Sequence, residues 1–196
     1  SMERMERQLE ALMLNMNTPD LVISTEMSIG MRWNNGLPNE ADPREILDTL
    51  PGKLSERLGA LAAKYGIYFI PGSMYEYSEA PGHPALYNAI PIFSPRGELI
   101  DVYRKMCPYY PAEEFVTPGD RYVVLDIPEK GIKVGVMNCH DWSFPEISRN
   151  LTLMGAQLLV RPALDPEGLY DIYRSMAQTR AVVGNDEGFR AVGVGA

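Results

Sequence analysis

The chain has 196 residues, of which 45% are hydrophobic and 22% charged, and it carries a formal net charge of −8. This length and composition are typical of a soluble globular protein, so we expect a single domain over residues 1–196. Asp and Glu outnumber Lys and Arg, and the basic residues form no cluster. Both features argue against nucleic acid or an anionic membrane surface as a partner. No apolar run approaches the roughly 20 residues that span a bilayer, and residues 1–17 are too charged for a secretory signal.

The chain contains two cysteines, Cys107 and Cys139, and two histidines. Two thiols give no disulfide framework, and this set of residues is too small for a zinc site of the usual ligand spacing. We therefore expect no metal ion and a reducing, cytoplasmic location.

The first half of the chain alternates helical and strand patterns. Apolar residues at helical spacing predict amphipathic helices, and short apolar runs bounded by turn residues predict strands. The turn Ser94-Pro95-Arg96-Gly97 indicates a hairpin between two of the strands. In chain order, the predicted elements are a helix at 5–15, a strand at 21–23, a helix at 54–65 and strands at 67–70, 86–93 and 98–104.

The second half continues the alternation after a polar, proline-bearing loop over residues 107–120. Residues 183–196 are rich in Gly and show only a weak strand pattern. Strands that alternate with helices, with one hairpin inserted, are typical of a layered α/β fold. In chain order, the predicted elements are strands at 122–125 and 132–137, a helix at 144–154, a strand at 157–160 and a helix at 166–181.

The stretch Asn138-Cys139-His140-Asp141-Trp142-Ser143-Phe144-Pro145-Glu146 places a thiol between a predicted strand and a predicted helix start. Ser143 and Glu146 have the spacing of a capping box, and Pro145 is in the first turn. The unpaired N–H groups and the positive dipole end of a helix would lower the pKa of the Cys139 thiol and hold a developing oxyanion. A buried, inert cysteine is the alternative for any single thiol.

Three reactive side chains follow predicted strands: Glu26, Lys105 and Cys139. Attack on an amide carbon needs a thiolate, a base that returns the proton to the leaving amine, and donors or a cation for the oxyanion. A thiol, a carboxylate and an ammonium supply these functions. Each residue on its own is more typical of a surface or capping position, so the prediction depends on the three occurring together.

Three motifs carry a resemblance to a known family: Leu21-Val22-Ile23-Ser24-Thr25-Glu26, Tyr103-Arg104-Lys105-Met106, and the Cys139 stretch continued by Ile147-Ser148-Arg149 and Gly155-Ala156-Gln157. In this order and separation they resemble the nitrilase superfamily of carbon–nitrogen hydrolases, over about residues 5–181. The Cys139 motif is the most specific of the three.

The resemblance implies roles for individual residues. Glu26 matches the general base and acid, Lys105 the group that stabilises the tetrahedral intermediate, and Cys139 the nucleophile. Pro108-Tyr109-Tyr110-Pro111-Ala112-Glu113 matches the setting of a second glutamate, which makes Glu113 the fourth site residue, with Glu114 as the alternative register. The family implies no organic cofactor.

The resemblance also suggests substrate contacts. The backbone N–H of His140 would join Lys105 in binding the oxyanion. Tyr109 and Trp142 are candidate pocket residues, although aromatic residues at such positions also pack in cores.

The motifs are most similar to aliphatic amidases and formamidases, which implies hydrolysis of a small aliphatic amide to an acid and ammonia through a thioester. An N-carbamoyl amino acid hydrolase remains an alternative, in which Arg161 or Arg174 binds the substrate carboxylate. A catalytically inactive relative or fragment that serves as an assembly module is a second alternative. An ammonia-supplying glutaminase is a third.

The family fold is a four-layer α-β-β-α sandwich, and its members associate through large faces, so we expect a homodimer or a higher homo-oligomer. Compared with the family pattern, an opening strand and several closing strands are lacking. We therefore expect that the sequence is a fragment of a longer chain.

Overall fold

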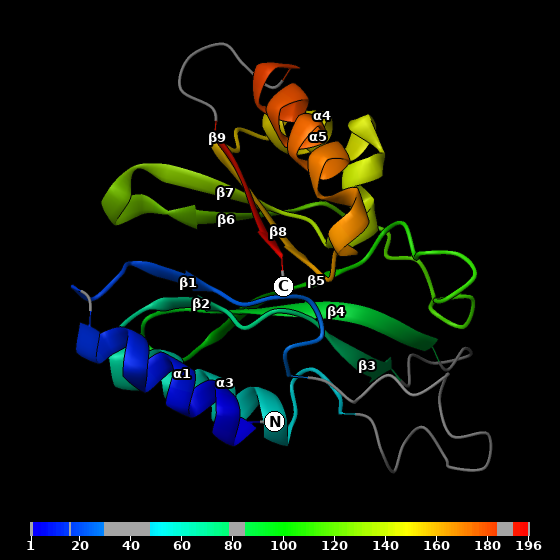
Figure 1. Ribbon diagram of the computed structural model, residues 1–196. Coiled ribbons are helices and arrows are strands. Elements are labelled where there is room, and N and C mark those ends of the chain that lie inside the picture. Colours follow the sequence, from blue (N-terminus) through cyan, green and yellow to red (C-terminus); the bar gives the residue numbers. More distant parts are fainter. Residues whose placement is uncertain (1, 16, 30–47, 79–84, 184–189, 196) are drawn as a thin grey trace.

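The computed structural model describes residues 2–15, 17–29, 48–78 and 85–183, and the backbone of residues 190–195. Two β-sheets lie face to face, and helices cover the outer face of each sheet (Figure 1). The arrangement is the four-layer α-β-β-α sandwich that the sequence predicted.

The first sheet has the order β1-β2-β4-β3, and β5 pairs with β4. The pair β1 and β2 is parallel, and the others are antiparallel. The predicted hairpin joins β4 to β5, and Gly97 in its turn adopts the left-handed conformation (φ 84°) that favours glycine. The strands are β1 (Leu21–Ile23), β2 (Tyr68–Ile70), β3 (Met74–Ser78), β4 (Ala85–Phe93) and β5 (Leu99–Arg104).

The second sheet has the order β6-β7-β8-β9. Its first pair is antiparallel, and the two pairs that follow are parallel. The weak strand pattern near the carboxyl-terminal end of the sequence corresponds to β9, which pairs with β8 over six residues. The strands are β6 (Val123–Ile127), β7 (Ile132–Val136), β8 (Leu158–Ala163) and β9 (Arg190–Gly195).

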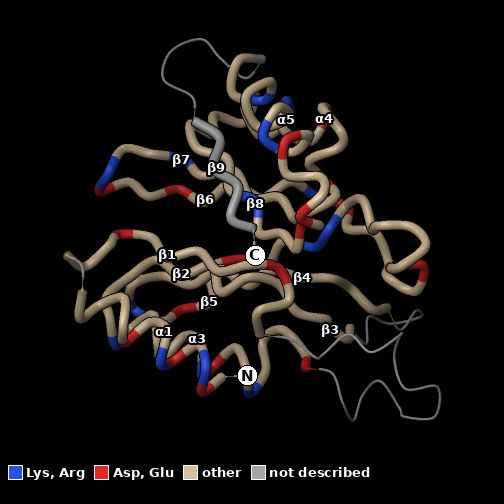
Figure 2. Tube along the Cα trace, in the orientation of Figure 1, with Lys and Arg blue, Asp and Glu red and all other residues tan. Residues whose placement is uncertain are grey.

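Helices cover the outer face of each sheet (Figure 1). α1 (Met2–Asn15) and α3 (Lys53–Tyr65) pack on the first sheet, and α4 (Pro145–Leu153) and α5 (Tyr170–Val183) on the second. Acidic and basic residues are intermixed along α1 and α3 (Figure 2). Within the described ranges, no helix combines the length and apolar character that crossing a bilayer requires.

Apolar side chains from both sheets form the central core. The packing of the two inner faces fixes one sheet on the other, and this brings the ends of β1, β5 and β7 together at one edge of the sandwich. The fully buried core residues include Ile70, Ile90, Ile92 and Tyr103 from the first sheet and Val134, Val136 and Val160 from the second.

The helix start after Cys139 differs from the prediction. Residues Cys139–Ser143 form a 3-10 helix. α4 begins at Pro145, one residue after the predicted start at residue 144, and Phe144 is its N-terminal cap. The predicted capping box of Ser143 and Glu146 is therefore wrong, because Ser143 belongs to the 3-10 helix. The Ser143 hydroxyl lies 3.3 Å from Nδ1 of His140.

Candidate active site

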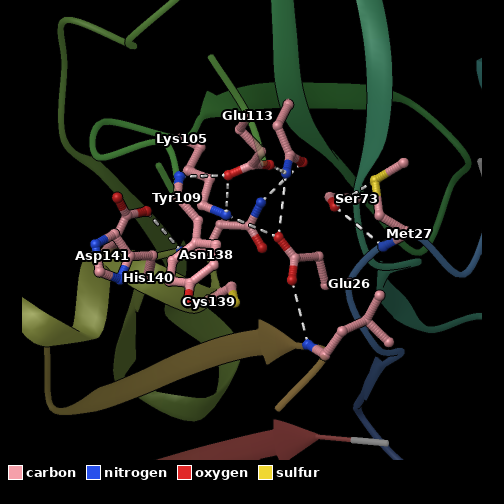
Figure 3. Close-up of polar contacts among 12 residues, drawn as sticks. Glu26, Met27, Ser73, Lys105, Tyr109, Glu113, Asn138, Cys139, His140 and Asp141 are labelled. Atoms are coloured by element: carbon pink, nitrogen blue, oxygen red, sulfur yellow. Dashed lines mark hydrogen bonds and ion pairs between the residues drawn. The ribbon is translucent and has the colours of Figure 1, made fainter. Parts of the chain in front are cut away.

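Three charged side chains meet between the sheets. Nζ of Lys105 lies 3.0 Å from Oε1 of Glu26 and 2.7 Å from Oε2 of Glu113 (Figure 3). All three residues are buried, and Lys105 is only 1% exposed. Glu26 is 79 positions from Lys105 in the chain, so folding joins two distant segments here.

Glu26 comes from a tight turn that follows β1. The chain leaves the strand with a hydrogen bond from Ser24 N–H to the carbonyl of Ile70, and Met27 has a positive φ of 55°. The N–H of Met27 donates to Oγ of Ser73 at 3.1 Å (Figure 3). These bonds fix the turn that directs the Glu26 side chain into the interior.

Glu113 comes from the loop after Lys105. Its Oε2 accepts the N–H of Tyr109 at 2.7 Å, and its own N–H donates to the carbonyl of Tyr109 at 2.7 Å. Glu114 is exposed. Of the two registers considered from the sequence, the structure therefore brings Glu113 into the cluster and leaves Glu114 outside it.

The two carboxylates keep Lys105 charged. Burial alone would lower the pKa of Lys105, but Glu26, Cys139 and Glu113 together raise it above its ordinary value. A buried ammonium between two carboxylates is a fixed positive charge. Such a charge is positioned to stabilise an anion that develops next to it.

Asn88, on β4, links the members of this cluster. Its Nδ2 donates to Oε1 of Glu26 at 3.1 Å and to Oε1 of Glu113 at 2.6 Å, and its Oδ1 accepts Nδ2 of Asn138 at 2.9 Å. Asn88 is fully buried. Asn88 was not predicted as a site residue, although an amide inside an apolar strand run was an available signal, since buried polar groups require partners.

Cys139 sits on a strained elbow between β7 and α4. Its φ is 44°, which is unusual for a residue other than glycine. Two contacts hold the elbow: the N–H of Asn138 donates to Oδ2 of Asp141 at 2.9 Å, and Nη1 of Arg161 donates to the carbonyl of Cys139 at 3.1 Å. Cys139 as a residue is partly exposed, so the strained elbow lies at the border of the site.

The Cys139 thiol is protonated at neutral pH. Its enclosure by protein and the neighbouring Glu26 carboxylate raise the pKa of the thiol to about 12, against the opposing effects of Lys105 and the N–H of Leu164. The expectation of a lowered thiol pKa is therefore wrong. Burial and the Glu26 carboxylate together outweigh the positive groups at this position.

The carboxylate of Asp141 is fully buried and accepts three hydrogen bonds. The donors are the Tyr103 hydroxyl at 2.6 Å, the N–H of Cys107 at 2.8 Å and the N–H of Asn138. Burial raises the pKa of Asp141 to about 6, and these donors hold it from rising further. Asp141 thus fixes the segment around Lys105 to the Cys139 elbow.

Aromatic rings border the elbow. The ring of His140 contacts Tyr109 and Phe144 edge-on, with centroids 5.1 and 5.3 Å apart. Burial and the charge of Lys105 lower the pKa of His140, so its ring is neutral at physiological pH. Tyr109 is half exposed, which leaves it accessible beside the site.

Trp142 does not lie beside the site as Tyr109 does. It is 1% exposed and packs in the core beneath α4, with the guanidinium of Arg161 5.5 Å from its ring centroid. Arg161 is itself buried and paired with Asp165. Arg174 lies on the exposed side of α5. Neither arginine contributes a free charge to the cluster around Lys105.

Within the described ranges, no group of three or more His, Cys, Asp or Glu residues is arranged to hold a metal ion. The grouped side chains offer a thiol, a carboxylate whose charge acts on that thiol and a fixed cation. This combination has the parts required for acyl transfer through a thioester.

Curated proteins similar to this chain include amidases. The chain is 34% identical over 127 residues to an omega-amidase from Xenopus tropicalis, which covers 60% of this chain and 44% of that protein. It is 36% identical over 121 residues to a formamidase from Bacillus cereus, with coverage of 60% and 34%. A formamidase from Bradyrhizobium is 29% identical over 194 residues, with coverage of 92% and 54%. The chain thus spans about half or less of the length of these relatives.

Solved structures share the fold. Nit3 of Saccharomyces cerevisiae, a member of the nitrilase superfamily, superposes with a TM-score of 0.76 at 22% identity, over 99% of this chain and 69% of that one. A carbon-nitrogen hydrolase from Helicobacter pylori superposes with a TM-score of 0.77 at 22% identity, over 98% and 66%. The model of the carbon-nitrogen hydrolase family matches residues 3–185, and the chain belongs to that family.

Proposed function

We propose that this protein hydrolyses the C–N bond of a small aliphatic amide, giving an acid and ammonia through a thioester on Cys139. One observation carries the proposal: the Glu26 carboxylate is hydrogen-bonded to Lys105 and at the same time raises the pKa of the Cys139 thiol. The omega-amidase and formamidase relatives agree with an amide substrate.

The geometry supports a two-stage reaction. Glu26 takes the thiol proton, sulfur bonds to the amide carbon, and the carbonyl electron pair moves to oxygen, where Lys105 and the backbone N–H of His140 stabilise it. The tetrahedral intermediate collapses, its C–N bond breaks, and Glu26 gives the proton to the departing nitrogen. Water then attacks the thioester with Glu26 as base, which releases the acid and restores the thiol.

The high thiol pKa makes the base essential. With a pKa of about 12, only a small fraction of Cys139 is thiolate at neutral pH, so proton removal must accompany attack. Lys105 cannot serve as the base, because its own pKa is raised and it stays protonated. This leaves Glu26 as the proton acceptor.

The environment of Arg161 favours an amide over an N-carbamoyl amino acid. Its guanidinium is paired with Asp165 and hydrogen-bonded to the Cys139 carbonyl. An arginine with these partners would have to break them to bind a substrate carboxylate, at a cost in free energy.

We also propose a homodimer or larger assembly. Apolar residues are exposed on α5 and just before it, including Tyr170 (66%), Ile172 (56%) and Val182 (73%). Exposed apolar side chains are common at association surfaces. The cytoplasmic location and the absence of nucleic-acid and membrane partners stay predictions from the sequence.

A substrate panel tests the function. Ammonia release is measured from formamide, acetamide, propionamide, N-carbamoyl amino acids and glutamine, for the wild type, Cys139→Ser and the control Cys107→Ser. We expect release from a small aliphatic amide by the wild type and the control, and none by Cys139→Ser. Equal release by all three proteins would rule out the thioester. No release from any compound, with Cys139 alkylated only after unfolding, would favour the assembly module.

A further inference from the structure

The two oxygens of the Glu26 carboxylate have different surroundings. Oε1 accepts hydrogen bonds from Nζ of Lys105 at 3.0 Å and from Nδ2 of Asn88 at 3.1 Å. Oε2 accepts one, from the N–H of Leu164 at 3.2 Å (Figure 3). A carboxylate oxygen has about two lone-pair sites. Oε1 is therefore saturated, whereas Oε2 keeps one site for a proton.

Oε2 is also the oxygen on the side of the nucleophile. The N–H of Leu164, which donates to Oε2, also opposes the rise in the pKa of the Cys139 thiol. One backbone donor thus acts on both the sulfur and Oε2. The free lone-pair site of Glu26 and the thiol proton are on the same side of the carboxylate.

We propose that Asn88 is a positioning residue that directs proton exchange with Cys139 to Oε2 of Glu26, by holding Oε1 against Lys105. The inference depends on the proposed function, in which Glu26 is the base. The S–H bond breaks as the Oε2–H bond forms, and the same proton later passes to the departing nitrogen. Oε1 keeps its two donors throughout, and Lys105 stays charged.

The position of Asn88 is fixed on every side. Its two amide hydrogens go to the two carboxylates, and its Oδ1 accepts Nδ2 of Asn138. Reversing the amide would place Oδ1 against both carboxylates and Nδ2 against the amide of Asn138, so only one orientation satisfies the hydrogen bonds. The carbonyl of Asn88 also accepts the N–H of Lys105 at 2.8 Å, which sets the backbone of both residues.

Asn88 also gives each of the two carboxylates a further donor. Glu26 and Glu113 share Lys105, so one positive charge faces two negative ones. Without Asn88, each carboxylate would lose a hydrogen-bond donor that stabilises its charge. A protonated Glu26 cannot accept the thiol proton.

The test replaces Asn88 by Ala. The measurements are made as a function of pH in a Cys107→Ala background. They are the rate of Cys139 alkylation by iodoacetamide and the kcat and KM for the amide substrate, with kcat calculated from the concentration of titrated active sites. We expect kcat to fall about 100-fold while KM changes by less than about threefold. We also expect the acid limb of both pH profiles to move to higher pH, by about one unit.

Two further variants make the result specific. Asn150→Ala removes an amide that bonds to Tyr122 and to the carbonyl of Glu146, away from the site, and we expect no shift of the acid limb. Asn138→Ala removes only the partner of Oδ1, and we expect a shift in the same direction but smaller. If Asn88→Ala does not fold, Asn138→Ala decides the matter. An unchanged acid limb in Asn88→Ala, or in Asn138→Ala where that variant decides, would overturn the proposal.

The alkylation profile separates this proposal from the function. It needs no substrate, so it reports on the carboxylate and the thiol even if the wild type releases no ammonia from any amide. A normal shift with no turnover would reject the proposed reaction and keep the positioning role. Turnover with an unshifted acid limb would reject the positioning role alone.

Discussion

The hydroxyl of Tyr103 donates a 2.6 Å hydrogen bond to the buried carboxylate of Asp141. Tyr103 is on β5 and lies two residues before Lys105 in the chain, and Asp141 lies two residues after Cys139. The same carboxylate accepts the N–H of Cys107, on the other side of Lys105. One side chain therefore aligns the cation and the nucleophile, which belong to different sheets.

Replacement of Asp141 by Asn should change how stability depends on pH. Because the pKa of Asp141 is raised to about 6, the folded protein binds this proton more tightly than the unfolded chain does. The contribution of Asp141 to the free energy of unfolding therefore grows as pH falls from about 6 to about 4. Urea unfolding across this range should show the gain in the wild type and not in Asp141→Asn.

The control for this experiment is Asp126→Asn, at an exposed position of β6. This variant should keep the pH dependence of the wild type, since Asp141 is intact. A parallel pH dependence in the wild type and Asp141→Asn would show that Asp141 does not titrate in this range.

Replacement of Glu26 by Gln should have opposite effects on Cys139 alkylation at low and high pH. At about pH 7 the variant should react more slowly, because it lacks the base that takes the thiol proton. At about pH 10 it should react faster than the wild type, because Glu26 is one of the groups that raise the thiol pKa. The measurement is the rate of iodoacetamide labelling in a Cys107→Ala background. Profiles that run parallel without crossing would contradict the placement of Glu26 beside the sulfur.

Replacement of Lys105 by Met should cost both activity and stability. The variant leaves the buried carboxylates of Glu26 and Glu113 without their cation, which typically destabilises a protein by about 3–5 kcal/mol. Adding Glu113→Gln removes one of the two negative charges, so the double variant should regain part of the stability and none of the activity. The free energy of unfolding in urea and ammonia release are the two measurements.

Lys130→Met is the matched control, since Lys130 makes an exposed ion pair with Asp20. It should change stability little, because exposed pairs are screened by solvent. If Lys105→Met is as stable as this control, the buried charges are not coupled as their distances indicate.

Replacement of Gly119 by Ala should displace the segment that carries Lys105. A Cβ at this position would lie 2.1 Å from the carbonyl oxygen of Arg104, and the N–H of Gly119 donates to the carbonyl of Lys105 at 2.8 Å. We expect a loss of about 1–3 kcal/mol in the free energy of unfolding and a lower kcat. Gly168→Ala is the control, because nothing lies within 4 Å of its Cβ. Equal behaviour of the two variants would show that the segment yields to the added methyl group.

The sequence predicted many elements because their signals are local. The apolar spacing of α1 and α3 and the turn residues of the β4–β5 hairpin act within a few positions of the chain. The strand β3 was not predicted, and β9 had only a weak pattern. Both are strands through their pairing with β4 and β8, and strand formation depends on such partners more than on local preference.

The motifs in the sequence supplied the identities of Glu26, Lys105, Glu113 and Cys139, since each stands in a recognisable local setting. The tertiary structure decided their relationships: Lys105 shared by two carboxylates, Asn88 between them, Trp142 in the core and Arg161 paired with Asp165. It also reversed the expected shift of the Cys139 pKa. Burial and electrostatic interactions depend on distances between segments that only folding brings together, so a linear sequence does not contain them in readable form.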